Sequence, residues 1–68
     1  MLNSILTIRE KEVFELLIRN NSTNDIARIL NISEKTVRNH ISNVIQKLDV
    51  KGRPSAVVEL IRLGEISL

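Results

Sequence analysis

The chain contains no cysteine, and this absence excludes both disulfide bonds and thiolate metal sites. His40 is the only histidine, so a metal site built from imidazole ligands is not expected either. We therefore expect no metal and no cofactor. A small chain that has no disulfide and no secretion signal is typical of intracellular proteins, so we expect it in the cytoplasm.

Aromatic residues and long apolar runs are also scarce. Phe14 is the only aromatic residue, which leaves the core to be built from Leu, Ile, Val and Ala. No apolar run approaches the length needed to cross a bilayer, so we expect no membrane partner. The chain has 68 residues, and a domain of this size buries only roughly 60% of the surface that its unfolded form exposes. We expect one domain that is not an enzyme, because so small a core leaves little room for a catalytic cavity.

Positive charge is concentrated in one part of the chain. The net charge is +2, but residues 33–53 contain five basic and two acidic residues and carry +3, which leaves −1 for the rest. A basic segment of this kind is the electrostatic footprint of a protein with a polyanionic partner. The charge distribution therefore indicates nucleic acid as the partner.

Four helices are predicted from capping signals and from the period of the apolar side chains, and no stretch alternates as a strand requires. Thr7 with Glu10, and Ser22 with Asp25, each form a capping box, and Ser33 is a good N-cap. The predicted fold class is therefore all-α. The predicted helices span about residues 8–19, 23–30, 34–48 and 54–63.

The ends of these helices are predicted from residues that tolerate special backbone geometry. The pair Asn20–Asn21 is expected to end the first helix, and a turn of about three residues at Asn31 separates the second from the third. Pro54 suits the first turn of the last helix, and Gly64 is expected to end that helix. Residues 1–6 are expected to form a loosely held tail.

The predicted helix 34–48 has two different faces. Five apolar residues recur at the spacing of one buried face: Val37, Ile41, Val44, Ile45 and Leu48. Six residues on the opposite face form what we call the polar strip: Lys35, Arg38, Asn39, Ser42, Asn43 and Gln46. A solvated helix face usually mixes Glu with Lys. The polar strip contains no acidic residue, so it differs from such a face.

The residue types of the polar strip match the chemistry of duplex DNA. Arg can bridge the O6 and N7 atoms of guanine, Asn and Gln can bridge N6 and N7 of adenine, and Lys and Ser can hold phosphates. A short helix followed after a tight turn by a longer one is the arrangement of helix-turn-helix proteins. The pattern predicts double-stranded DNA as the partner, and the alternative is a solvated face on a small bundle. Lys51 and Arg53 follow the helix, where phosphate contact and simple solvation are both open.

Several short motifs are distributed between Leu6 and Leu63. They are Leu6-Thr7-Ile8-Arg9-Glu10, Asp25-Ile26-Ala27, Ser33-Glu34-Lys35-Thr36-Val37-Arg38-Asn39-His40, Lys47-Leu48 and Arg53. Together they resemble the motifs of LuxR-type helix-turn-helix domains, and the resemblance implies a four-helix fold that binds DNA. Two departures, Asp25 for the usual Glu and Asn20 for the preferred Gly, lie outside the polar strip and concern the geometry of helix ends.

The resemblance also implies roles for individual residues. The family's base-contacting positions fall on Arg38, Asn39 and Ser42. Thr36, His40 and Lys47 match positions that resemble backbone contacts or supports of the recognition helix. With the rest of the polar strip and the basic residues beyond it, the expected backbone or support residues are Lys35, Thr36, His40, Asn43, Gln46, Lys47, Lys51 and Arg53.

Within the LuxR-type family, the strongest resemblance is to a stand-alone regulator of sporulation. It rests on residues 33–43, on the segment Val50-Lys51-Gly52-Arg53 and on residues 56–60. This resemblance implies a transcription factor that acts late in sporulation on spore-coat genes.

The predicted helix 54–63 is apolar over more than half of its circumference, with Ala56 and Leu63 at the inner edge of the apolar arc. A helix that packs on a small bundle needs an arc of about 100°, so the excess indicates a partner. In LuxR-type domains the last helix commonly pairs with its own copy, which would present two recognition helices to symmetric half-sites. The alternative is a helix sunk deeply into its own core. The expected dimer interface consists of Val57, Val58 and Ile61.

These observations predict a transcriptional regulator that binds duplex DNA as a homodimer and affects the recruitment of RNA polymerase. The alternative from another class is a helical protein-interaction module that docks on a protein partner through its last helix. A third interpretation is the excised output domain of a longer response regulator, although Met1 favours a free-standing protein. The salt dependence of duplex binding separates the first two, because only phosphate neutralisation makes affinity fall steeply with salt.

Overall fold

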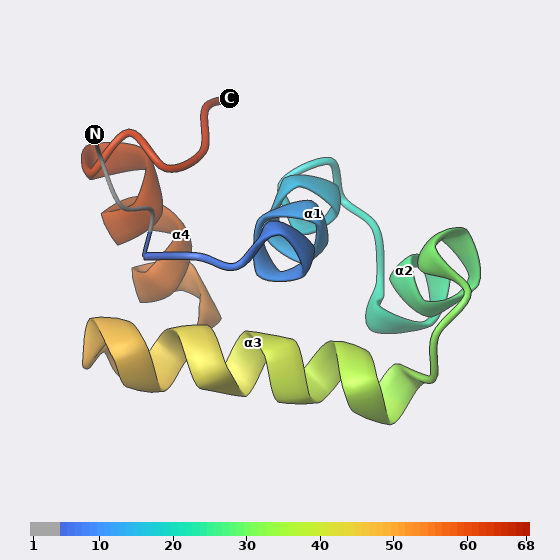
Figure 1. Cartoon of the computed structure of the whole chain (residues 1–68). Helices are drawn as coiled ribbons and strands as arrows, with labels where there is room; N and C mark the ends of the chain where they lie inside the picture. Colours follow the sequence, from blue (N-terminus) through green and yellow to red (C-terminus); the bar gives the residue numbers. More distant parts are fainter. Residues whose placement is uncertain (1–4) are drawn as a thin grey trace.

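The computed structural model describes residues 5–68. Over that range the chain forms α1 (Ile8–Leu17), α2 (Thr23–Leu30), α3 (Glu34–Leu48) and α4 (Arg53–Arg62), as Figure 1 shows. No strand occurs within residues 5–68. The predicted all-α fold class is confirmed.

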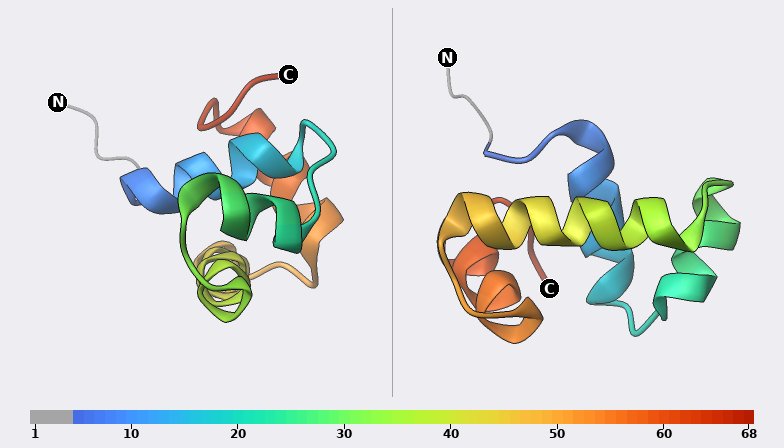
Figure 2. Two further views of the ribbon diagram at one scale, coloured as in Figure 1. Left: turned by 90° about the vertical axis from the view of Figure 1, so that its right-hand side faces the viewer. Right: turned by 90° about the horizontal axis from the view of Figure 1, so that it is seen from below.

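The longest helix, α3, is the one on which the other three pack. It contacts α1, α2 and α4. In Figure 1, α2 lies over its N-terminal half, α1 over its middle and α4 over its C-terminal half. In the view from below (Figure 2, right), α3 lies in front of the other helices. One side of α3 therefore faces the core, and no helix covers its other side.

The capping signals of the sequence form as predicted. The Thr7 hydroxyl accepts from the backbone N–H of Glu10 at 3.1 Å, and the Glu10 carboxylate accepts from the Thr7 N–H at 2.9 Å. Ser22 and Asp25 make the same reciprocal pair at 3.0 and 3.1 Å. These bonds satisfy N–H groups that the first turn of each helix would otherwise leave without a partner.

The turn between α2 and α3 has three residues, as predicted. Asn31 adopts the left-handed conformation with φ of 57°, which reverses the chain direction after α2. The N–H of Ile32 then donates to the carbonyl oxygen of Ala27 at 2.9 Å. Ser33 begins the next helix by accepting from the N–H of Thr36 at 3.0 Å. The helix-turn-helix geometry is therefore held by local bonds.

The helix α1 ends at Leu17, two residues before the predicted end at 19. After Leu17 the backbone tightens, because the N–H groups of Arg19 and Asn20 donate to carbonyl oxygens only three residues earlier. Asn20 then takes a left-handed φ of 69° and stops the helix. The stop residue was correctly predicted, but the tightened last turn is not visible in the apolar pattern.

The helix α4 begins and ends one residue earlier than predicted. Gly52 is its N-cap and Arg53 its first residue, so Pro54 lies second in the first turn. At the other end, Gly64 has φ of 76°, and its N–H donates to the carbonyl oxygen of Ile61 at 3.0 Å. Gly64 thus ends the helix, as expected.

The core is built from aliphatic side chains around a single aromatic ring. The largest fully buried side chains are Phe14, Ile26, Ile41, Leu60, Val13, Val37 and Val44. Ile45 and Leu48 are partly buried and pack against this cluster. The apolar face predicted for α3 is therefore its core-facing side.

Two segments outside the helices also enter the core, which the sequence did not predict. Leu6 is only 6% exposed and Ile66 only 4% exposed. The prediction of a loose tail over residues 1–6 is therefore wrong for Leu6, and residues 1–4 lie outside the described range. An isolated apolar residue beyond a helix end has no periodic pattern, so neither contact could be recognised from spacing.

The buried position of Ala27 provides a test of the packing between α2 and α3. Ala27 is 7% exposed on a helix that contacts α3. We expect Ala27→Leu to lower stability by about 1–3 kcal/mol through overpacking. At about 4–8 °C per kcal/mol for a small domain, the loss is measurable by thermal melting. Ile29→Phe is the control, because it adds bulk at an exposed position of the same helix, and it should melt near the wild-type temperature. An unchanged melting temperature for Ala27→Leu would contradict this packing.

Candidate nucleic-acid interface

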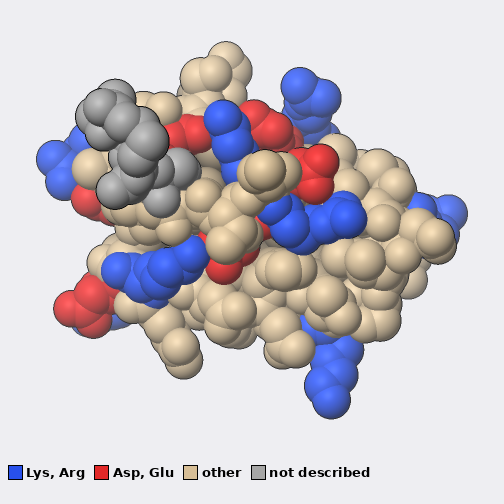
Figure 3. Space-filling model, in the orientation of Figure 1, with Lys and Arg blue, Asp and Glu red and all other residues tan. Residues whose placement is uncertain are grey.

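The polar strip lies on the uncovered side of α3. All six of its residues are exposed, whereas Val37, Ile41 and Val44 on the opposite side of the same helix are buried. In Figure 3 the lower part of the molecule, over α3, is mostly neutral surface, with basic atoms projecting downwards on the right and basic and acidic atoms together at the left edge. The residues expected to contact bases, Arg38, Asn39 and Ser42, are thus on one accessible surface.

Arg38 has a partner that the sequence analysis did not consider. Its Nη1 atom donates to Oε2 of Glu34 at 3.1 Å, one helical turn earlier. The same Oε2 accepts from the hydroxyl of Thr23 on α2 at 2.7 Å. The Thr23 hydrogen bond is the main reason why the pKa of Glu34 lies below its ordinary value, and Arg38 adds to this lowering. The spacing of four between Glu34 and Arg38 is a signal that could have predicted the ion pair.

Thr36 and His40 occupy the flanks of α3 rather than its exposed face. Both are partly buried. The Thr36 hydroxyl lies 2.8 Å from that of Ser33, and its N–H is held by the same hydroxyl, so Thr36 belongs to the cap of the helix. This placement favours the support role over the backbone-contact role for Thr36.

Lys47 is held by groups on the α1 side of the molecule. Its Nζ atom donates to the Glu10 carboxylate and, at 2.9 Å, to the carbonyl oxygen of Ile5. Glu10 is the only charged residue among the buried residues of the described range. Of the two roles that the resemblance implies for Lys47, this geometry favours support of the recognition helix.

The pKa of the Glu10 carboxylate is subject to opposing influences. Burial is the largest single influence and raises the pKa of Glu10, but the bonds from Lys47 and Thr7 together outweigh it and lower the pKa below its ordinary value. The capping box and the ion pair therefore share one carboxylate. This carboxylate joins the start of α1 to the last turn of α3.

Lys51 and Arg53 are exposed just beyond α3, at the end opposite Lys35. A helix of 15 residues is about 22 Å long at a rise of about 1.5 Å per residue. Exposed basic side chains therefore lie at both ends of α3, over a length comparable to several base pairs.

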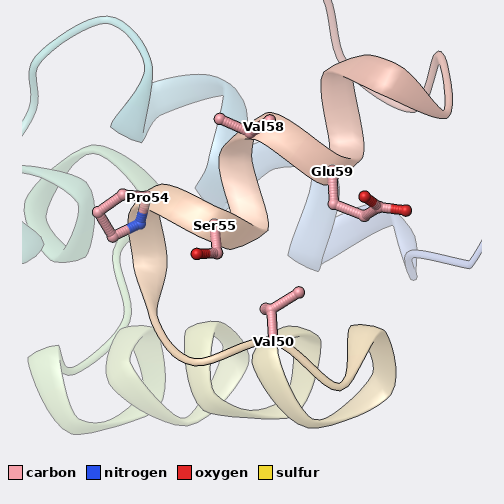
Figure 4. Close-up of a pocket in the computed structure, with 5 residues that line it drawn as sticks. All are labelled: Val50, Pro54, Ser55, Val58 and Glu59. Carbon is pink, nitrogen blue, oxygen red and sulfur yellow. The ribbon is translucent and has the colours of Figure 1, made fainter.

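The residues expected at a dimer interface differ in exposure. Val58 is 63% exposed, whereas Val57 and Ile61 are partly buried against the core. Leu63, expected at the inner edge, is 46% exposed because it lies at the C-cap, where α4 ends. Figure 4 shows an open pocket beside Val58, between α4 and the end of α3. Its lining residues are Val50, Pro54, Ser55, Val58 and Glu59.

Within residues 5–68, no group of three or more His, Cys, Asp and Glu side chains is placed to hold a metal ion. None of the described helices combines the length and apolar character needed to cross a membrane.

A model of the bacterial regulatory proteins of the luxR family matches residues 4–60. The chain belongs to the LuxR family. The resemblance inferred from the motifs is therefore confirmed, and the match includes α1, α2, α3 and most of α4.

The chain covers very different shares of two curated relatives. The spore germination protein GerE of Bacillus subtilis is 66% identical over 64 residues, which cover 94% of this chain and 86% of GerE. The transcriptional regulatory protein DegU of Brevibacillus brevis is 48% identical over 94% of this chain but only 27% of DegU. The chain thus spans most of the first relative and about a quarter of the second.

Solved structures agree with the family assignment. The structure of the transcription factor GerE matches with a TM-score of 0.94 and 65% identity, over 96% of this chain and 97% of the chain in that structure. The response regulator ChrA of a heme-sensing two-component system matches with a TM-score of 0.85 and 30% identity, over 97% of this chain and 33% of ChrA. The chain is a DNA-binding transcriptional regulator with the LuxR-type helix-turn-helix fold.

The buried Glu10 carboxylate predicts a specific dependence of stability on pH. Because its pKa is lower in the folded protein than in the unfolded one, its contribution is complete above the unfolded value of about 4.3 and is lost as pH falls through the folded value. At pH 7 we expect Glu10→Gln to be less stable than wild type by about 1–3 kcal/mol. The difference should shrink below about pH 4, where protonation makes wild type resemble the variant.

Urea unfolding between about pH 7 and pH 3 measures this difference. Glu12→Gln is the matched control, because its side chain is 46% exposed on the same helix and pairs only with Arg9. That control should change stability little at any pH. A deficit of Glu10→Gln that stays constant down to pH 3 would show that the charge of Glu10 contributes nothing.

Proposed function

We propose that this LuxR-family regulator binds duplex DNA sequence-specifically by inserting α3 into the major groove. The observation that carries the proposal is the polar strip, whose six residues are exposed on the side of α3 that no helix covers. The major groove is about 12 Å wide and accepts one α-helix. Selection of bound sequences from random duplex DNA tests the proposal, since it gives the motif, its symmetry and the half-site spacing together.

In this proposal the side chains of α3 fall into two groups. Arg38, Asn39 and Ser42 contact base edges, because their donors and acceptors can pair with those that the bases present in the major groove. The other residues of the polar strip, together with Lys51 and Arg53, contact phosphates and fix the register of the protein on the duplex. Lys47 supports the helix through its bond with Glu10.

We propose further that the protein binds as a homodimer through α4. The support is the exposure of Val58 beside the open pocket, together with the small size of the core. A two-fold dimer would present two copies of α3 to half-sites of the same symmetry. Val57 and Ile61 are partly buried, and the exposed parts of their side chains would join the same contact.

The proposed biological role follows from the similarity to GerE, which is named a spore germination protein. We propose that the chain regulates transcription during sporulation, acts late on spore-coat genes, and affects recruitment of RNA polymerase at promoters. A regulator of this kind works in the cytoplasm and needs no catalytic activity or cofactor. A module that only docks on a protein partner is the competing class, and a weak salt dependence of duplex binding would favour it.

The first test of the proposal compares a base contact with a phosphate contact. Arg38→Ala should weaken binding at the selected site by about 1–3 kcal/mol and relax specificity at one base pair. Lys51→Ala should weaken binding to all duplexes and lower the salt slope by about 1. Binding titrations on the selected site, on its single-pair variants and on random duplex measure both effects. Equal, sequence-independent losses for both variants would remove Arg38 from base contact.

The second test concerns the dimer. Val58→Asp would place a carboxylate against its symmetric copy, and an unpaired buried charge costs on the order of several kcal/mol. We expect this variant to remain helical by circular dichroism, to sediment as a monomer, and to bind a palindromic site much more weakly than wild type. Val58→Thr has nearly the same shape and should dimerise more strongly than Val58→Asp. Wild-type sedimentation and palindrome affinity for Val58→Asp would exclude a dimer through this residue.

A further inference from the structure

The described residues contain one acidic side chain that is bonded to the polar strip, and it is held from two sides. Glu34 is the first residue of α3 and lies one turn before Arg38. Its Oε2 atom accepts from Arg38 Nη1 at 3.1 Å and from the Thr23 hydroxyl at 2.7 Å. An ordinary exposed pair at this spacing contributes little, because two long side chains must be ordered to form it. Here the hydroxyl of Thr23, on α2, already holds the Glu34 carboxylate in place.

The bond to Glu34 uses only one edge of the Arg38 guanidinium. A guanidinium has five N–H donors in a plane, and Nε and Nη2 together form an edge with two parallel donors. Two parallel donors match the O6 and N7 acceptors of guanine. Because Glu34 binds Nη1, the Nε–Nη2 edge remains for a base. The side chain of Arg38 is 55% exposed, so this edge is accessible.

We propose that Glu34 is a positioning residue that determines specificity, because it holds Arg38 in an orientation ready for one base pair and is itself held by Thr23. This inference rests on the proposed function, in which Arg38 contacts a base. A side chain that is ordered before binding loses less conformational entropy when it binds. The resulting gain in affinity applies only to a base pair that offers acceptors to both donors of Arg38. Glu34 therefore favours the preferred base pair over others.

The charge of Glu34 has an opposite effect on binding to DNA in general. The pKa of Glu34 is lowered by the bond from Thr23, so the side chain is an anion at neutral pH. An anion at the surface that meets the phosphate backbone repels every duplex equally, whatever its sequence. The charge of Glu34 thus weakens binding to every duplex, and only the positioning of Arg38 raises the ratio of specific to non-specific affinity.

Two variants separate the orientation of Arg38 from the charge of Glu34. Glu34→Gln removes the charge and the ion pair, whereas Thr23→Val changes no charge and removes only the Thr23 hydroxyl, whose bond is the stronger of the two from α2 to Glu34, the other coming from Asn24. Glu12→Gln is the matched control, since it makes the same charge change in an exposed Arg–Glu pair on α1, which spans Arg9 and Glu12. Thermal melting of each variant shows how much of any change in binding reflects the loss of folded protein.

The duplexes are the selected site, the same site changed at the base pair where Arg38→Ala loses discrimination, and a scrambled duplex of equal composition. Glu34→Gln should bind the scrambled duplex more tightly than wild type and should lose discrimination at that base pair by about threefold to tenfold. Thr23→Val should lose discrimination at the same base pair, with the salt slope and the affinity for the scrambled duplex unchanged. Glu12→Gln should keep the discrimination of wild type.

The outcomes distinguish this inference from the proposed function. If Arg38→Ala relaxes one base pair but Glu34→Gln and Thr23→Val discriminate as wild type does, the positioning role is overturned and the proposed function stands. A gain in affinity of Glu34→Gln that is equal for all three duplexes also overturns it, because charge alone explains such a gain. If Glu34→Gln does not fold, the discrimination of Thr23→Val at that base pair tests the positioning role. If Arg38→Ala relaxes no base pair, the proposed function and this inference fall together.

Discussion

The structure depends on the requirement that α3 pack on one side against three helices while its other side stays uncovered. Val37, Ile41 and Val44 meet the first condition, since they are buried and the other three helices pack on α3. The polar strip meets the second. The other three helices of the described chain all pack on α3. A change that shifts α3 therefore alters stability and the proposed DNA contact together.

Most of the basic residues near α3 fit the proposed DNA contact. Lys47 differs, because it bonds to groups within the protein and stabilises the fold. The Lys47 ammonium group donates a hydrogen bond to the buried Glu10 carboxylate, and Glu10 also takes part in the capping box of α1. Removing either partner would leave the other with an unmet charge, which costs more than the pair contributes when intact. Because Glu10 lies in the first turn of α1 and Lys47 in the last turn of α3, this pair fixes the start of α1 against the end of α3.

The sequence was sufficient for features that depend on local rules. The capping boxes at Thr7 and Ser22, the left-handed turn at Asn31 and the two faces of α3 follow from short-range spacing, and the structure contains each of them. The contacts that it did not reveal join distant segments. Lys47 meets Glu10 across 37 residues, and Thr23 meets Glu34 across 11. No helical period relates such positions, so only the three-dimensional arrangement could bring them together.

The comparison with ChrA separates what the fold requires from what recognition requires. A TM-score of 0.85 at 30% identity means that the same backbone forms although most aligned residues differ. A core that accepts many combinations of aliphatic residues explains this tolerance, provided that volume and pattern are kept. The fold therefore does not determine which base pairs are bound. In the proposed function that choice lies in the exposed side chains of α3, and Glu34, which is bonded to Arg38, is the residue proposed to orient one of them.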